Sequence, residues 1–196
     1  ALVNLVPRFY DATDGRITID GHDVRDIPQD QLREIVGLAL QEALLFQGDV
    51  RFNLKFGAEG VEDKQMFEAA KAADAHGFVT GLPETWGAPV ARRGYNFSGG
   101  QRQRLSIART LTAAPKVLIL DDSTSALDVA TESRVQAAIP ELYEGITTIY
   151  IAQRISAVID LDRIVLMENG EITAIGTHEE LMEASEAYRN IFARYE

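Results

Sequence analysis

Two acidic residues follow an apolar run near the middle of the sequence. Residues 117–120 read VLIL, and Asp121 and Asp122 come directly after them. Four consecutive apolar residues are typical of a strand buried on both faces of a parallel sheet, and open α/β sheets bind ligands beyond the carboxyl ends of such strands. A carboxylate there suits a Mg²⁺ ion that bridges nucleotide phosphates, and the second carboxylate is a candidate general base. The alternative is that both aspartates only cap the turn into the next helix.

The segment FSGGQ, residues 97–101, is the second candidate for chemistry. Gly99 and Gly100 stand at the beginning of a predicted helix, where they permit a ligand to approach the backbone closely. The N–H groups of the first turn and the Ser98 hydroxyl point out at the positive end of the helix dipole. We therefore predict a phosphate site at Ser98 to Gln101, although a serine N-cap with flexible glycines is the simpler interpretation of SGG alone.

Strand and helix patterns alternate along the chain around these two segments. Alternating or short apolar runs predict strands at residues 16–20, 38–40, 117–120 and 148–152. Helical spacing predicts a helix from Glu62, one that follows Gly100 and stops before Pro115, and one that carries Val135, Ile139 and Leu142. The end of the sequence predicts a hairpin over residues 163–176 with its turn at Asn169-Gly170, and then a helix opened by a Thr177 to Glu180 capping box. This order of elements predicts an α/β fold with a parallel core sheet.

The composition excludes several classes of protein. The 196 residues carry a formal net charge of −11, which repels a phosphate backbone and disfavours a nucleic-acid binder. There is no cysteine, so disulfides and thiolate metal sites are excluded. The three histidines are scattered without metal-ligand spacing, and no apolar run approaches the ~20 residues that span a bilayer.

The order FSGGQ, VLILDD, SALD resembles the nucleotide-binding domain of an ABC transporter over essentially the whole chain. The resemblance implies that Ser98, Gly99, Gly100 and Gln101 form the signature motif, that Asp121 belongs to the Walker B strand, and that Ser125 to Asp128 is the D-loop. It also implies that Gln41 is the Q-loop glutamine, which meets the metal together with Asp121 and faces the membrane domains. ATP and Mg²⁺ are the implied cofactors. The segment GTHEEL, residues 176–181, is similar to the tails of exporter-type members.

One family motif does not occur in this sequence. The family's P-loop, G-x-x-x-x-G-K-[ST], wraps the phosphates of the nucleotide, and no such segment is found. The first residues, ALVNLVPRFYD, look like the helix that follows that loop. We therefore expect a chain that begins just inside this helix, lacks the N-terminal strands that complete the sheet, and is inactive alone.

Two residues depart from the pattern of active members. The resemblance places a catalytic Glu where this chain has Asp122, which is one methylene shorter, and a switch histidine where it has Gln153. A shorter carboxylate and a side chain that takes up no proton both disfavour hydrolysis. The chain thus resembles the degenerate member of a heterodimeric exporter, whose intact signature completes the partner's ATP site in trans.

The resemblance implies a P-loop NTPase (RecA-like) α/β core with an inserted α-helical subdomain. Residues 1–41 and 115–196 are expected to form the core, and residues 42–114 the subdomain with the signature motif. The implied partners are a second nucleotide-binding domain and the transmembrane domains of an exporter, at the cytoplasmic face of the membrane. The alternatives are a non-enzymatic regulatory or assembly module, favoured by the missing P-loop, and a chromosome-maintenance ATPase, disfavoured by the net charge.

Overall fold

The structure of the chain is a computed structural model, which describes residues 2–58 and 60–195. These residues form two compact units, of which the first ends at Ile151 and the second begins at Ala152. None of the described helices combines the length and the apolar composition that a bilayer span requires.

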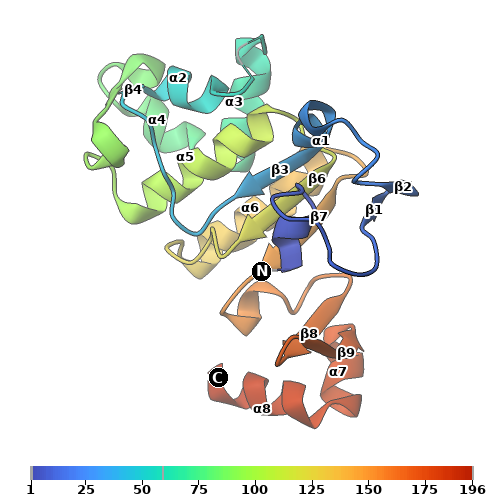
Figure 1. Cartoon of the computed structure of the whole chain (residues 1–196). Helices are drawn as coiled ribbons and strands as arrows, with labels where there is room; N and C mark the ends of the chain where they lie inside the picture. Colours follow the sequence, from blue (N-terminus) through green and yellow to red (C-terminus); the bar gives the residue numbers. More distant parts are fainter. Residues whose placement is uncertain (1, 59, 196) are drawn as a thin grey trace. The chain divides into compact units, whose positions relative to one another are not determined.

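A parallel sheet of three strands lies at the centre of the first unit (Figure 1). The strands are β3 (Val36–Ala39), β6 (Val117–Asp121) and β7 (Thr147–Ile151), in the order β3-β6-β7. The central strand β6 is buried at its first four positions, which confirms the prediction from the VLIL run. The second predicted buried strand, β7, is only partly buried. That prediction was wrong because β7 pairs with β6 on one side alone and is an edge strand of this sheet.

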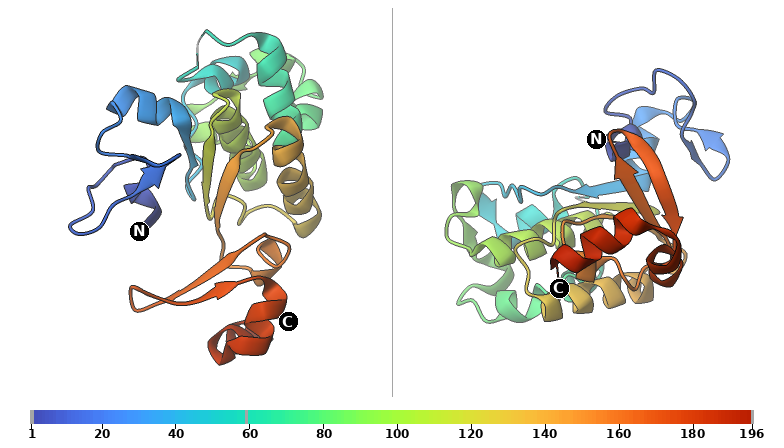
Figure 2. Two further views of the ribbon diagram at one scale, coloured as in Figure 1. Left: turned by 90° about the vertical axis from the view of Figure 1, so that its right-hand side faces the viewer. Right: turned by 90° about the horizontal axis from the view of Figure 1, so that it is seen from below.

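The two faces of the sheet are covered by different elements. Alternate residues of a strand point to opposite faces. Leu118 and Leu120 therefore pack with the helices, whereas Val117 and Ile119 pack on the opposite face with Leu32 and neighbouring residues of the first part of the chain. Figure 2 shows the helices on one side of the sheet and the N-terminal segments on the other. Burial on both faces explains why β6 carries no polar residue before Asp121.

Helices cover one face of the sheet. They are α2 (Val50–Lys55), α3 (Asp63–Ala72), α4 (His76–Thr80), α5 (Gly99–Thr112) and α6 (Val129–Leu142). The positions that share the predicted apolar stripe of α5, namely Leu105, Ala108 and Leu111, are fully buried, and so are Met66 and Ala70 of α3. The predicted periodicities of both helices are therefore confirmed.

The remaining elements of the first unit are short. They are α1 (Gln29–Ile35), the hairpin of β1 (Thr18–Ile19) and β2 (His22–Asp23), the hairpin of β4 (Gly48–Asp49) and β5 (Pro89–Val90), and 3-10 helices at Leu2–Leu5, Thr85–Gly87 and Arg92–Gly94.

The N-terminal segments differ from the prediction in length. The expected helix at the beginning is only the 3-10 helix Leu2–Leu5, because Pro7 has no N–H to donate and disfavours helical backbone at the residue before it. The strand expected at residues 16–20 is reduced to β1. Asp20 and Gly21 form the tight turn with φ angles of 50° and 81°, so the chain reverses before a longer strand can pair.

The second unit contains the predicted hairpin and two helices. Strands β8 (Ile164–Glu168) and β9 (Glu171–Gly176) pair in antiparallel fashion across Asn169 and Gly170, whose φ angles are 53° and 85°. Both angles are positive, as the predicted two-residue turn requires. The 3-10 helix Ile155–Ala157 and helices α7 (His178–Ala184) and α8 (Glu186–Tyr195) complete the unit. Its buried hydrophobic residues include Ala157, Ile164, Leu181 and Tyr188.

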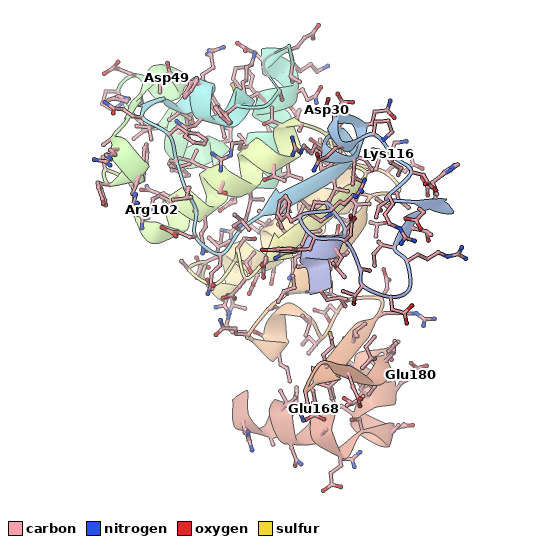
Figure 3. The ribbon with its side chains drawn as sticks, viewed as in Figure 1. Asp30, Asp49, Arg102, Lys116, Glu168 and Glu180 are labelled. Atoms are coloured by element: carbon pink, nitrogen blue, oxygen red, sulfur yellow. The ribbon has the colours of Figure 1, made fainter. Side chains whose placement is uncertain are left out.

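The capping box of α7 yields a stability prediction. The Thr177 hydroxyl accepts the N–H of Glu180 at 3.3 Å, and the Glu180 carboxylate accepts the N–H of Thr177 at 2.9 Å; Figure 3 labels Glu180 at this helix start. We expect Thr177→Ala to cost about 1 kcal/mol of unfolding free energy, measured by urea denaturation followed by circular dichroism. Ser156→Ala, at an exposed serine of the same unit, is the control and should change stability by less than about 0.5 kcal/mol. Equal losses in the two variants would contradict the role assigned to the cap.

Candidate functional site

The two acids sit where the sequence predicted them, at the carboxyl end of β6. Asp121 is the last residue of the strand and pairs with Ile151 of β7. The N–H of Asp122 donates to the Ile151 carbonyl at 2.8 Å, and the φ angle of Asp122 is +49°. This uncommon backbone conformation turns the chain out of the sheet immediately after the strand. Asp122 is nevertheless only 7% exposed, so its carboxylate is held against the protein.

Gln41 meets the second of these acids. It lies two residues beyond the end of β3, and β3 runs parallel to β6, so both segments reach the same edge of the sheet. Its Nε2 donates to Oδ2 of Asp122 at 2.7 Å. Two residues that are 81 positions apart, predicted as a metal ligand and a general base, thus contact each other directly.

The oxygen donors at this edge are few. Among residues 2–58 and 60–195 no three histidine, aspartate or glutamate side chains are grouped so as to enclose a metal ion. Mg²⁺ is usually held by one or two carboxylates, with phosphate oxygens and water as its other ligands. The carboxylate of Asp121, together with the amide oxygen of Gln41, fits that donor set and does not form an all-protein metal cage.

The SGGQ segment begins α5 as a capped helix. The Ser98 hydroxyl accepts the N–H of Gln101 at 3.2 Å, and the Gln101 side chain accepts the N–H of Ser98 at 2.9 Å. This capping box satisfies the backbone N–H of Gln101, and the backbone N–H of Arg102 donates to the Ser98 carbonyl. Helix geometry leaves the N–H groups of Gly99 and Gly100 without an intrahelical partner, so these are the groups that an anion can reach. The serine cap and the predicted anion site are therefore compatible.

The two glycines also pack inside this chain. A Cβ atom on Gly100 would lie 3.1 Å from the carbonyl oxygen of Ala126, and one on Gly99 would lie 3.7 Å from the Cβ of Ala126. From the sequence we expected the glycines to admit a ligand. The structure shows that Gly100 in addition admits the backbone of the 125–127 loop.

Asp128 and Ser125 have different surroundings within that loop. Asp128 is the N-cap of α6, because its carboxylate accepts the N–H of Thr131 at 2.9 Å and the Thr131 hydroxyl at 2.8 Å. These two hydrogen bonds stabilise the charged carboxylate and lower the pKa of Asp128. The Ser125 hydroxyl accepts a hydrogen bond at 3.3 Å from Nε2 of Gln103 on α5. The conformation of the loop is thus determined by side chains on both of its neighbouring helices.

Gln103 and Glu132 are two of the buried polar residues that were not predicted. Gln103 is 6% exposed and Glu132 is 3% exposed. Gln103 also accepts the N–H of Ala126 at 2.8 Å, and Glu132 accepts a hydrogen bond from the Thr124 hydroxyl. A signal was present in the sequence, because each of these residues lies three or four positions before a buried apolar residue of its own helix.

A hollow of about 260 Å³ connects the Gln41 segment with the start of α5. It is lined by Gln41, Glu42, Ala43, Leu44, Arg93, Tyr95, Gly99, Arg102 and Gln103; Figure 3 labels Arg102 in the first turns of α5. A larger hollow of about 690 Å³ includes Lys116, Val117 and Thr147, which lie at the amino ends of β6 and β7. No predicted site residue lines it, so it is separate from the candidate site.

Gln153 belongs to the second unit. It is exposed and lies in the bend that follows β7, two residues beyond Ile151. The predicted residues of the first unit therefore form two groups: Gln41, Asp121 and Asp122 at the edge of the sheet, and the start of α5 with the loop that contains Ser125.

Comparison with known proteins agrees with this arrangement. A family model described as "ABC transporter" matches residues 1–125. The chain is 46% identical over 191 residues to the "Putative multidrug export ATP-binding/permease protein YgaD" of Bacillus subtilis (strain 168), which covers 97% of this chain and 33% of that protein. It is 47% identical over 181 residues to the "ATP-dependent lipid A-core flippase" of Syntrophus aciditrophicus (strain SB), which covers 92% of this chain and 30% of that protein. The chain thus spans about a third of the length of these relatives.

A solved structure agrees with the predicted fold class. The structure of a bacterial Atm1-family ABC exporter with ATP bound superposes with a TM-score of 0.93 at 35% identity, over 98% of this chain and 34% of that one. This likeness confirms the predicted α/β core with an inserted helical part. Since the family model also covers more than half of the sequence, this chain belongs to the ABC transporter family.

Proposed function

We propose that this chain is the ATP-binding part of an ABC exporter and couples ATP binding and hydrolysis to transport across a membrane. In this proposal the chain lies at the cytoplasmic face of that membrane. Bound Mg²⁺-ATP supplies the polyphosphate that is cleaved. Asp121 and Gln41 would hold the metal, and the start of α5 would bind phosphate oxygens. The relatives described as export and flippase proteins support this proposal.

The hydrogen bond between Gln41 and Asp122 is the observation on which the proposal mainly rests. It joins the segment after β3 to the acids after β6 at the carboxyl edge of a parallel sheet, where α/β proteins bind their ligands. If a nucleotide at this edge moves the Asp122 carboxylate, the hydrogen bond from Gln41 moves the segment that follows β3 with it. Gln41 is thus placed to link the nucleotide to whatever that segment contacts.

The start of α5 acts on a second nucleotide site. The chain has no P-loop motif, but it has an intact SGGQ segment with two N–H groups available to an anion. We propose that a second ATP-binding domain faces this one and that Ser98 to Gln101 complete the site of that partner. The chain's own acids would form the weaker of two composite sites, since Asp122 is short and Gln153 takes up no proton.

A double substitution tests this weak site. Asp122→Glu with Gln153→His should raise ATP turnover at least about tenfold in the complete transporter that carries this sequence, because it restores a base and a titratable group. Turnover is measured as phosphate release in membranes. Asp30→Glu with Gln29→His, at two exposed residues of α1, makes the same chemical changes outside the candidate site and should leave turnover within about twofold. Unchanged turnover in the test pair would show that the site is not limited by these residues, and absence of any turnover in the unmodified transporter would contradict the proposed function itself.

The surface beyond Gln41 is the proposed contact with the membrane-spanning part. Phe46, Phe52 and Phe56 are each more than 40% exposed. The Phe56 ring centroid lies 4.3 Å from that of Phe46, in a tilted arrangement, and 5.8 Å from that of Phe52, edge to face. The guanidinium of Arg109 lies 5.4 Å from the Phe46 ring, and burial lowers the pKa of Arg109 because desolvation disfavours its charge. An exposed apolar cluster that adjoins the Gln41 segment supports the view that a partner covers it.

A further inference from the structure

We propose that Gln103 is a positioning residue that makes the 125–127 loop and the start of α5 move as one rigid unit. The inference rests on the proposed function, in which the start of α5 completes the nucleotide site of the partner domain. It concerns how this chain holds the 125–127 loop against that helix start, and it assigns a role to Gln103, three residues beyond Gly100 in α5.

The geometry of Gln103 shows two bonds to one loop. Its Oε1 accepts the N–H of Ala126 at 2.8 Å, and its Nε2 donates to the Ser125 hydroxyl at 3.3 Å. Gln103 itself is only 6% exposed, whereas Ser125 and Ala126 are exposed, so a buried side chain holds an exposed stretch of the loop. Loss of the Gln103 amide would remove the acceptor of the Ala126 N–H, which would then have to bond to water, and the loop would lose its hydrogen bonds to α5.

A second contact lies one turn earlier on the same helix. Because the Cβ position of Gly100 lies only 3.1 Å from the Ala126 carbonyl oxygen, the backbone of the helix start and that of the loop are packed without a side chain between them. Leu127, the next residue of the loop, is 5% exposed and belongs to the main core cluster. The loop is thus held by an amide, by backbone packing and by a buried leucine.

The consequence concerns catalysis in the partner's site. When an anion binds at Gly99 and Gly100, the rigid connection through Gln103 places the Ser125 side chain at a fixed position relative to that anion. Catalytic groups that are held in place before the reaction avoid the entropic cost of ordering. Loss of the hydrogen bonds between Gln103 and the loop should therefore lower kcat. The affinity for ATP should not change, because the N-terminus of α5 itself is intact.

The test compares Gln103→Leu with a matched variant of a half-buried glutamine on another helix. Gln65 on α3 donates from Nε2 to the Thr112 carbonyl at 2.9 Å and so binds the other end of α5 without touching the loop. In the complete transporter with its partner, we expect Gln103→Leu to lower kcat about tenfold, with KM for ATP within about twofold, and to speed hydrogen exchange of the Ala126 amide about tenfold. Gln65→Leu should leave all three quantities within about twofold.

A conservative variant separates positioning from simple destabilisation. In Gln103→Glu, one carboxylate oxygen still accepts the Ala126 N–H. The second oxygen replaces Nε2 and accepts a hydrogen bond from the Ser125 hydroxyl, which now acts as the donor. It should recover most of the exchange protection and of kcat. The proposal is overturned if Gln103→Leu leaves Ala126 exchange unchanged, if Gln65→Leu lowers kcat equally, or if Gln103→Glu behaves like Leu. A transporter that shows no ATP turnover before any substitution would refute the proposed function, whereas the exchange measurement would still decide whether Gln103 holds the loop.

Discussion

Gly100→Asp is expected to lower ATP turnover of the complete transporter about 100-fold, as is typical when a preorganised anion-stabilising group is lost. Two physical effects combine at this position. The new carboxylate would compete with a phosphate for the N–H groups of Gly99 and of residue 100 itself, and its charge would repel the phosphate. The new Cβ would also lie 3.1 Å from the Ala126 carbonyl oxygen and displace the loop.

Two further variants identify the cause. Gly77→Asp introduces the same charge in α4, where a new Cβ meets no atom within 4 Å, and it should leave turnover within about twofold. Gly100→Ala adds the crowding without the charge, so its ATP turnover should lie between those of Gly100→Asp and Gly77→Asp. Phosphate release in membranes measures all three. If Gly100→Asp retained normal turnover, the start of α5 would not be a nucleotide-binding element.

Leu118→Ala should reduce the free energy of unfolding by about 3 kcal/mol. Leu118 has no exposed surface, lies in the central strand β6, and packs against the helical face of the sheet. The neighbouring strands on both sides limit how far the structure can relax into the cavity, so the cost should lie within the upper part of the usual range. Urea unfolding followed by the fluorescence of Trp86, a buried member of the same core cluster, measures it.

Leu40→Ala is the matched control for this prediction. It makes the same chemical change at a leucine that is 46% exposed just beyond β3. Its expected cost is less than about 1 kcal/mol, since little apolar surface is removed from a packed environment. Similar losses in the two variants would mean that the VLIL strand is not the centre of the core.

Local patterns were sufficient to predict most elements. The stripe of Leu105, Ala108 and Leu111 predicted α5 because a buried helical face repeats every three to four residues. The Asn169-Gly170 turn and the Thr177 capping box were equally predictable, since their backbone requirements involve only neighbouring residues. Strand lengths were less predictable. The expected strand at residues 16–20 has only two residues in β1, because the strand that pairs with it is equally short.

The sequence by itself determined the order of motifs, and with it the family and the fold class. Residue types at fixed spacing indicate Asp121, Asp122 and Ser98 to Gln101 because their chemistry is local to a strand end or a helix start. Only the tertiary structure decided that Gln41 binds Asp122 and that Gln103 binds the loop at Ala126. These contacts join residues that are 81 and 23 positions apart, and they depend on the parallel pairing of β3 with β6 and on the packing of glycine against backbone. Neither leaves a periodic signal, because a hydrogen bond between distant segments depends on how the elements pack and not on the residues beside it.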